Sequence, residues 1–232
     1  MGQLTKKVPK CLLPIGGEPL LEIWLKLLEY HGINEVLINT HWLSEEVKNF
    51  IRQWKIIHPN SKLKIVTKYE KTLLGSGGTI FHNKNWIDDE EPFFILFADN
   101  LTNVNLTKMR LYHDSHEKEL TIGVFHSETP KKCGIVEINK DNTVKAFIEK
   151  PKNPPTNLAA AGVYLTDKRI FKYFPETNDD KQTLDLGFHI LPKLVNKMKA
   201  YLLNDILIDI GTPDSYEKAK EAYSDMNKEF IY

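Results

Sequence analysis

The segment FFILFADN, Phe93–Asn100, decides the fold of this chain of 232 residues. Its first six residues are apolar and favour β-structure, so they predict a buried strand that ends at Asp99. In open α/β sheets, ligands bind beyond the carboxyl ends of the strands, and we expect the Asp99 carboxylate to project into that crevice. The alternative is that Asp99 forms a turn and caps the next segment.

The residues before this segment alternate between helix and strand patterns. Apolar residues at helical spacing predict a helix that starts near Leu20 and stops before Gly32, and Ser44 is expected to cap a second helix. Glu35–Asn39 is expected to be a buried strand and Leu63–Lys68 another. This alternation predicts an α/β, Rossmann-like fold with a mainly parallel mixed sheet flanked by helices.

The second half of the chain predicts an antiparallel addition to that sheet, because short strand patterns follow one another without helices between them. Thr212 is expected to cap a final helix that has Pro213 at its first position. No repeat or convincing linker divides the chain, so we expect one domain over residues 1–232. The expected consecutive strands are Leu120–His126, Gly134–Ile138, Val144–Lys150 and Ala161–Leu165.

The composition excludes several classes of function. Lys+Arg and Asp+Glu both number 31, so no overall field attracts nucleic acid or a membrane, and any anion site must be local. Cys11 and Cys133 lack metal-type spacing and are expected to be free thiols in a reducing compartment. The longest apolar run, Phe93–Ala98, is too short to cross a bilayer, and the N-terminus has no signal core. We therefore expect a cytoplasmic protein.

Asp209 is the second candidate carboxylate. It lies among Ile206, Ile208 and Ile210, where a charge is costly to bury unless something pairs with it. Together, Asp99 and Asp209 would form an oxygen-rich site suited to Mg²⁺ and bound phosphates.

Two lysines in stiff settings supply the opposite charge. Lys10 follows a proline, and Lys150 lies between Glu149 and Pro151 at the end of an expected strand. The glycines of LLGSGG leave room for a flat or anionic ligand to approach the backbone, although the segment matches neither the Walker pattern nor GxGxxG.

Taken together, five segments resemble the sugar-nucleotide pyrophosphorylases, the nucleotidyltransferases that join a sugar 1-phosphate to an NTP. The resemblance extends from Leu4 to about Ala222, and the motifs occur in the family's order. It implies a fold of the nucleotide-diphospho-sugar transferase type. The segments are VPKCLLPIGGEPLLE (Val8–Glu22), TLLGSGGTI (Thr72–Ile80), FADN (Phe97–Asn100), IEKP (Ile148–Pro151) and IDIGTPDSY (Ile208–Tyr216).

This resemblance implies a role for each candidate. Lys10 would contact the nucleotide phosphates, Lys150 the sugar phosphate and Glu149 the sugar hydroxyls. Asp99 and Asp209 would bind Mg²⁺. Lys10, Asp99, Lys150 and Asp209 are the expected catalytic residues.

The resemblance also implies how the rest of the substrate is held. The loop of Gly75, Ser76, Gly77 and Gly78 would hold base and ribose, and its lack of a preceding glutamine favours guanine over thymine. Asn100 and Gly162 would complete the substrate contacts. Ala160 departs from the pattern, because the family usually has Asn there.

The function that the resemblance implies is synthesis of an NDP-sugar and pyrophosphate, with guanylyl transfer to mannose or heptose 1-phosphate favoured. The partners would be NTP and sugar 1-phosphate, with no nucleic acid or membrane, in a homodimer or homotetramer that serves polysaccharide biosynthesis. The alternative is a catalytically inactive regulatory or nucleotide-sugar-binding homologue. A sugar transferase with a DxD metal motif is disfavoured, because Leu101 takes the position of the second Asp.

The printed sequence begins late in the family's pattern. The family has a strand and a glycine-rich loop, G-x-G-T-R-L-x-P-L-T, before the lysine segment, and here QLT matches only its tail. Losing a central strand would expose the edges of both neighbouring strands. We therefore expect the natural chain to carry this strand and loop ahead of Leu4.

Overall fold

A computed structural model describes residues 2, 4–87, 92–176 and 183–230, with side chains described as far as residue 224. The chain forms two compact units. Unit 1 comprises Met1–Thr72, Ala98–Leu106 and Asp205–Tyr232, and unit 2 comprises Leu73–Phe97 and Thr107–Asn204. The expectation of one domain over residues 1–232 stays a prediction.

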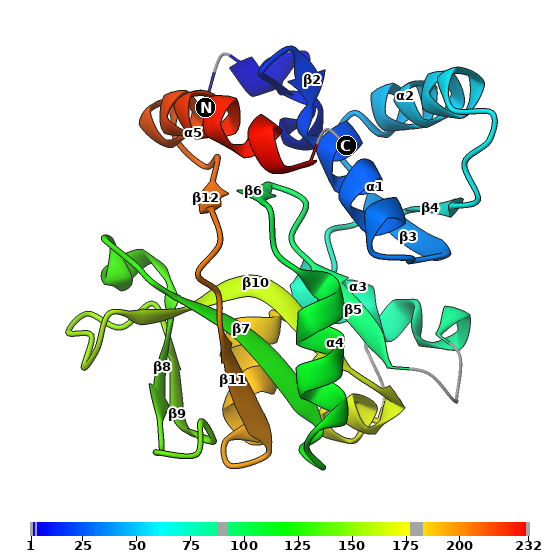
Figure 1. The fold of residues 1–232 in the computed structure, drawn as a ribbon. Coiled ribbons are helices and arrows are strands. Elements are labelled where there is room, and N and C mark those ends of the chain that lie inside the picture. The colour runs from blue at the N-terminus through cyan, green and yellow to red at the C-terminus, as the bar shows by residue number, and fades with distance from the viewer. Residues whose placement is uncertain (1, 3, 88–91, 177–182, 231–232) are drawn as a thin grey trace. The chain divides into compact units, whose positions relative to one another are not determined.

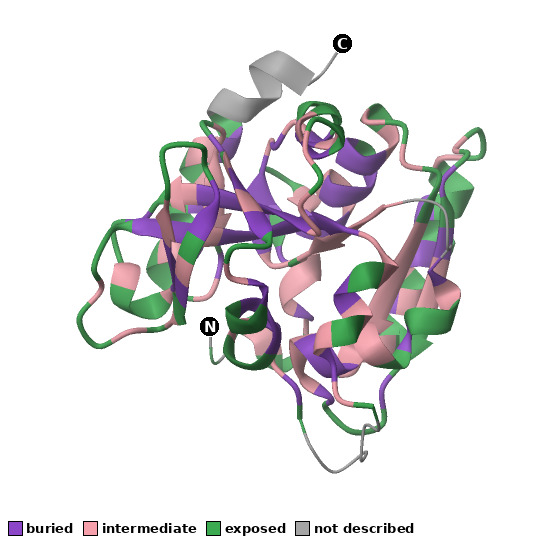
Figure 2. Ribbon diagram, turned by 90° about the horizontal axis from the view of Figure 1, so that it is seen from below, coloured by how far each residue is buried: buried purple, intermediate pink, exposed green. Residues whose placement is uncertain are grey.

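Unit 1 combines helices with short pairs of strands. β3 and β4 pair in parallel, whereas β6 and β12 pair antiparallel, as do β1 and β2. Its helices α1 and α2 bury apolar residues, among them Trp24 and Trp54. Figure 2 shows buried and exposed residues side by side on the helices of the chain. Its elements are β1 (Pro14–Ile15), β2 (Glu18–Pro19), α1 (Leu20–Tyr30), β3 (Glu35–Thr40), α2 (Ser44–Ile57), β4 (Lys64–Tyr69), β6 (Asn100–Thr102), β12 (Leu207–Asp209) and α5 (Pro213–Phe230).

The helix ends of unit 1 test the predicted caps. Thr212 caps α5 as predicted, because its Oγ1 accepts a hydrogen bond from the backbone N–H of Ser215 at 3.1 Å. The prediction for Ser44 is wrong: Ser44 is the first helical residue of α2, and the cap is Leu43 in the left-handed region, without a side-chain bond. β3 is a strand as predicted, but it is mostly half-buried rather than buried.

Unit 2 is built on a six-stranded sheet in the order β11-β7-β10-β8-β9, with β5 also pairing with β10. β11, brown in Figure 1, runs parallel to β7, and β10 runs antiparallel to β5, β7 and β8. The elements are α3 (Gly75–His82), β5 (Phe93–Leu96), α4 (Leu106–Asp114), β7 (Leu120–His126), β8 (Gly134–Ile138), β9 (Val144–Glu149), β10 (Leu158–Thr166) and β11 (Met198–Leu202).

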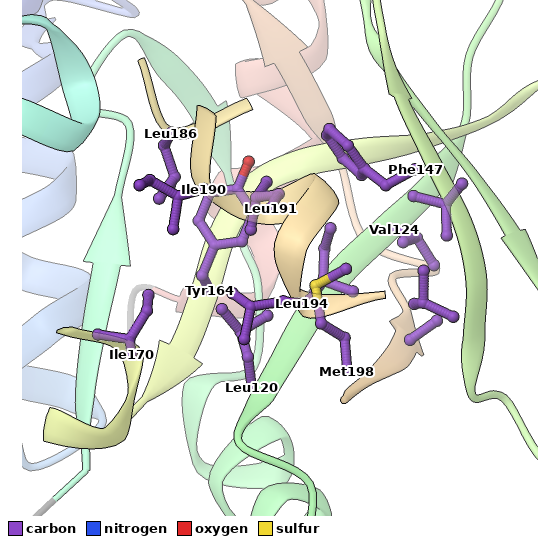
Figure 3. Close-up of a cluster of buried hydrophobic side chains, with 14 of the residues drawn as sticks. Leu120, Val124, Phe147, Tyr164, Ile170, Leu186, Ile190, Leu191, Leu194 and Met198 are labelled. Carbon is purple, nitrogen blue, oxygen red and sulfur yellow. The ribbon is translucent and has the colours of Figure 1, made fainter. Parts of the chain in front are cut away.

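Two short helical segments cover one face of β7. Alternate residues Leu120, Ile122 and Val124 join the core with the π-helix Leu186–Ile190 and the 3-10 helix Leu191–Leu194. Figure 3 shows Leu120 and Val124 in this cluster beside Leu191 and Leu194. The intervening residues point the other way, because successive side chains of a strand alternate between faces.

The predicted α/β class, with a mixed sheet flanked by helices, is confirmed, as is the antiparallel addition in the second half. Phe93–Leu96 is the strand β5, which places Asp99 three residues beyond its end. Antiparallel pairings outnumber parallel ones among the described strands, contrary to a mainly parallel sheet, because β10 runs against all three of its neighbours. Among the described helices, none is both long and apolar enough to cross a membrane.

A histidine pair joins α4 to the sheet. His113 Nδ1 and His116 Nε2 lie 2.7 and 2.9 Å from Oγ1 of the fully buried Thr121. The hydroxyl can donate its one proton only to a ring that is neutral, and it accepts a hydrogen bond from the N–H of the other ring. Burial, with His113 and Lys199 nearby, lowers the pKa of His116 to about 4.

We expect this pair to make unit 2 less stable in acid. The folded-state pKa of His116 lies below its unfolded value, so the unfolded chain gains the proton first as the pH falls from about 6.5 towards 4. Between pH 7.5 and 5, wild type should lose about 1 kcal/mol more than His116→Gln, allowing for partial exposure. Urea unfolding of both proteins at the two pH values measures this difference, and equal losses would contradict it.

Candidate functional site

Lys10 and Asp99 form an ion pair in unit 1. Lys10 opens the 3-10 helix Lys10–Leu12 after Pro9, and its Nζ lies 2.9 Å from Asp99 Oδ2. Both side chains are about one-third exposed, at 35% and 38%. Lys10 and Asp99 are far apart in the sequence, but the fold brings their opposite charges together. Solvent or a ligand can reach both side chains.

The electrostatics keep Lys10 charged. Burial alone lowers the pKa of Lys10, but the charge and hydrogen bond of Asp99, together with the charge of Asp209, outweigh it and raise the pKa. The contribution of Asp209 indicates that its carboxylate acts on the same lysine.

The pairing of β6 with β12 relates the two candidate carboxylates. Asp209 lies opposite Asn100 in this ladder, and the backbone N–H of Ile210 donates to the Asp99 carbonyl at 3.0 Å. Asp209 is exposed, whereas Ile210 is fully buried, so the carboxylate avoids the cost that burial among the isoleucines would carry. The isoleucines and the aspartate point to opposite sides of the strand.

Gly211 leaves room for the Asp209 carboxylate. A Cβ at position 211 would lie 3.1 Å from Asp209 Oδ2. Within the described residues, no group of three or more His, Cys, Asp or Glu side chains gathers to hold a metal. Two accessible carboxylates suit Mg²⁺, which commonly takes one or two from the protein and the rest of its ligands from water and phosphates.

The glycines of the LGSGG loop are packed against their own chain in unit 2. Gly75 has a φ of +78°, and a Cβ there would lie 2.5 Å from the Leu184 carbonyl oxygen. A Cβ at Gly77 would lie 3.1 Å from the same oxygen, a tight contact, and Gly78 donates its N–H to the Leu184 carbonyl at 2.9 Å. Close packing therefore already requires these glycines, and their contact with base and ribose stays a prediction.

Asp185 is a further candidate site residue, which no sequence motif indicates. Its Oδ2 accepts a hydrogen bond from Ser76 Oγ at 3.1 Å, and Ser76 Oγ in turn accepts from the Leu186 N–H at 2.8 Å. No motif marked Asp185, because it meets Ser76 only through the folding of a distant segment onto α3.

Glu149 and Lys150 end β9. The Glu149 side chain is only 15% exposed, and Gly187 makes room for it, since a Cβ at 187 would lie 2.8 Å from Glu149 Cδ. Burial and the charge of Asp185 raise the pKa of Glu149, although Lys150 opposes this. Lys150 Nζ lies 3.6 Å from Glu149 Oε1. A carboxylate and an ammonium thus adjoin at the end of β9.

Gly162 marks an irregularity in β10. It has a φ of +69°, and its carbonyl accepts the N–H of Phe97 at 3.0 Å. The register between β10 and β7 shifts between Ala160 and Tyr164. A bulge of this kind can redirect neighbouring side chains, but substrate contact by Gly162 stays a prediction.

The structure gathers the predicted residues into two groups. Unit 1 contains Lys10, Asp99, Asn100 and Asp209, and unit 2 contains the glycine loop with Glu149, Lys150 and Gly162. Asn100 is buried, and its carbonyl accepts a hydrogen bond from Trp24 Nε1 at 2.9 Å. The roles assigned to all these residues remain predictions.

Comparisons with known proteins identify the family of this sequence. Residues 2–226 match the profile of the family described as Nucleotidyl transferase. A glucose-1-phosphate adenylyltransferase of Clostridium beijerinckii is 30% identical over 94% of this chain and 61% of its own length. A glucose-1-phosphate adenylyltransferase of Bacillus subtilis is 28% identical over 93% of this chain and 62% of its own length. The chain thus spans about three fifths of the length of these curated relatives.

Solved structures show the same fold. HddC from Yersinia pseudotuberculosis matches with a TM-score of 0.75 at 23% identity, over 96% of this chain and 93% of its own. A UDP-glucose pyrophosphorylase complexed with UDP-glucose matches with a TM-score of 0.80 at 21% identity, over 97% and 93%.

We expect Gly75→Ala to destabilise the fold itself. The left-handed φ and the clash with the Leu184 carbonyl should together cost about 3 kcal/mol. The control Gly32→Ala has a similar φ of +71° but open space, and should cost only about 1 kcal/mol. Urea unfolding compares the two. If Gly75→Ala were no costlier than the control, packing against Leu184 would not explain the glycine.

Proposed function

Because the chain belongs to the Nucleotidyl transferase family, we propose that it joins an NTP to a sugar 1-phosphate, producing an NDP-sugar and pyrophosphate. The observation that carries this proposal is the Lys10–Asp99 pair with Asp209 nearby. The pair offers a fixed positive charge for phosphate oxygens beside two carboxylates that suit a hard cation.

The reaction asks for positioning and charge, not for a protein nucleophile. A phosphate oxygen of the sugar 1-phosphate attacks the α-phosphorus in line, and pyrophosphate leaves. Lys10 would bind the nucleotide phosphates and offset the charge that develops there. Mg²⁺, held by Asp99 and Asp209, would supply further positive charge to the phosphate oxygens.

Unit 2 supplies the residues that suit the sugar phosphate. Lys150, whose side chain is 56% exposed, would bind the phosphate, and Glu149 would accept hydrogen bonds from sugar hydroxyls. Both roles follow from the chemistry of the side chains and the family pattern.

For the base, we propose guanine, since the loop lacks the glutamine expected for thymine, and for the sugar, mannose or heptose 1-phosphate. ATP is the main competitor, because the curated relatives described above are named adenylyltransferases. A homodimer or homotetramer remains the proposed assembly.

The proposal predicts Mg²⁺-dependent pyrophosphate release from one NTP with a hexose or heptose 1-phosphate. The assay is a coupled screen of GTP, ATP, UTP and dTTP against glucose, mannose and heptose 1-phosphates, using the full-length natural protein. Asp99→Asn should abolish turnover while changing stability by no more than about 1 kcal/mol, the range of a partly exposed ion pair. Silence of the folded wild type across the whole panel would favour the regulatory alternative, and full activity of Asp99→Asn would remove Asp99 from the mechanism.

Substitutions of the two lysines should each weaken the binding of a different substrate. Lys150→Ala should raise KM for the sugar 1-phosphate about ten- to a hundred-fold with little change for NTP, and Lys10→Ala should do the reverse, because a charge-assisted hydrogen bond contributes about 1.5–3 kcal/mol. Lys152→Ala and Lys7→Ala, which remove exposed neighbouring charges, are matched controls. Equal effects of each variant on both substrates would show that the assignments are wrong.

A further inference from the structure

Phe188 presents an exposed aromatic ring beside the charged residues of unit 2. It lies in the π-helix Leu186–Ile190 and is 54% exposed. Its backbone N–H donates to Asp185 Oδ1 at 2.9 Å, which holds the main chain at Phe188 to the segment packed on α3. The neighbouring Gly187 faces the Glu149 carboxylate.

The ammonium of Lys150 lies between two attractive neighbours. Its Nζ is 3.6 Å from Glu149 Oε1 and 5.9 Å from the centroid of the Phe188 ring. The ring distance is within the range at which an aromatic face attracts a cation. The Glu149 distance is longer than a charge-assisted hydrogen bond, so the carboxylate does not hold the ammonium tightly.

The backbone of Lys150 is also fixed. It adopts a left-handed φ of +48°, and its N–H donates to the Cys133 carbonyl at 3.0 Å. With the backbone held, only side-chain rotation decides whether the ammonium contacts the carboxylate or stays over the ring.

We propose that Phe188 is a positioning residue: its ring attracts the Lys150 ammonium, keeps it from closing onto Glu149, and so leaves both groups available to a sugar phosphate. Without the ring, the ammonium collapses onto the carboxylate, and each charge then neutralises the group that the substrate needs. This inference rests on the proposed function for its substrate, whereas the ring–ammonium contact is independent of it.

The contact itself is tested by NMR on protein carrying ¹³C-labelled lysine. An ammonium over an aromatic face places the neighbouring ε-methylene in the shielding region, so its protons should resonate upfield of the other lysines. The signal is assigned by its loss in Lys150→Arg. It should move back to the ordinary lysine range in Phe188→Leu, which keeps apolar bulk without a π face, and stay upfield in Phe188→Trp.

Binding tests the consequence. In calorimetry on the full-length protein, Phe188→Leu should weaken glucose or mannose 1-phosphate binding about two- to five-fold, the strength of an exposed cation–π contact. NTP affinity should be unchanged, and Phe188→Trp should restore sugar 1-phosphate binding. Leu202→Ala is the control, because it removes an apolar side chain that is 46% exposed on β11, a strand with no predicted site residue.

The outcomes separate this inference from the proposed function. An ordinary Lys150 signal in wild type, equal losses for both substrates in Phe188→Leu, or no rescue by Phe188→Trp would overturn the role of Phe188 alone. An upfield signal in a wild type that binds no sugar 1-phosphate would instead overturn the proposed function and the substrate role that depends on it.

Discussion

The close approach of Leu184 to the glycines of α3 is the constraint on which the chemistry of unit 2 depends. Leu184 donates its N–H to the Leu74 carbonyl and accepts the N–H of Gly78, so a distant segment docks through its main chain. A side chain at position 75 would prevent this docking. Once docked, the segment brings Asp185 to Ser76 and Gly187 to Glu149, and the π-helix continues from there.

The two units manage charge differently. In unit 1, Lys10 neutralises Asp99 directly, so the carboxylate and the ammonium can both remain charged while partly exposed. In unit 2, Glu149 is more buried, and burial together with Asp185 works against its charge, while Lys150 stays 3.6 Å away. Burial and Asp185 therefore raise the pKa of Glu149, whereas the charge of Lys150 lowers it, so the two neighbours act on the carboxylate in opposite directions.

The sequence predicted those features of the fold that local patterns and family motifs determine. Apolar spacing located α1, β3 and β5, and the Thr-Pro pair located the cap of α5. It failed where a tertiary contact decides. No local motif indicates Asp185. The exposure of Asp209 depends on which side of β12 faces the core. The cap of α2 is Leu43 in the left-handed region and not the predicted Ser44.

The topology of the chain explains why the backbones of Asp99 and Asp209 lie close together. The chain leaves unit 2 for unit 1 at Ala98 and again at Asp205, and β6 and β12 follow these crossings directly. Because the two returning segments pair with each other, the register that joins Ile210 to the Asp99 carbonyl fixes the backbones of both aspartates within unit 1. Their relation therefore rests on a ladder inside one unit. Two carboxylates far apart in sequence can in this way be brought together by a short strand pair. This requires that each lies close to the point where the chain re-enters the same unit.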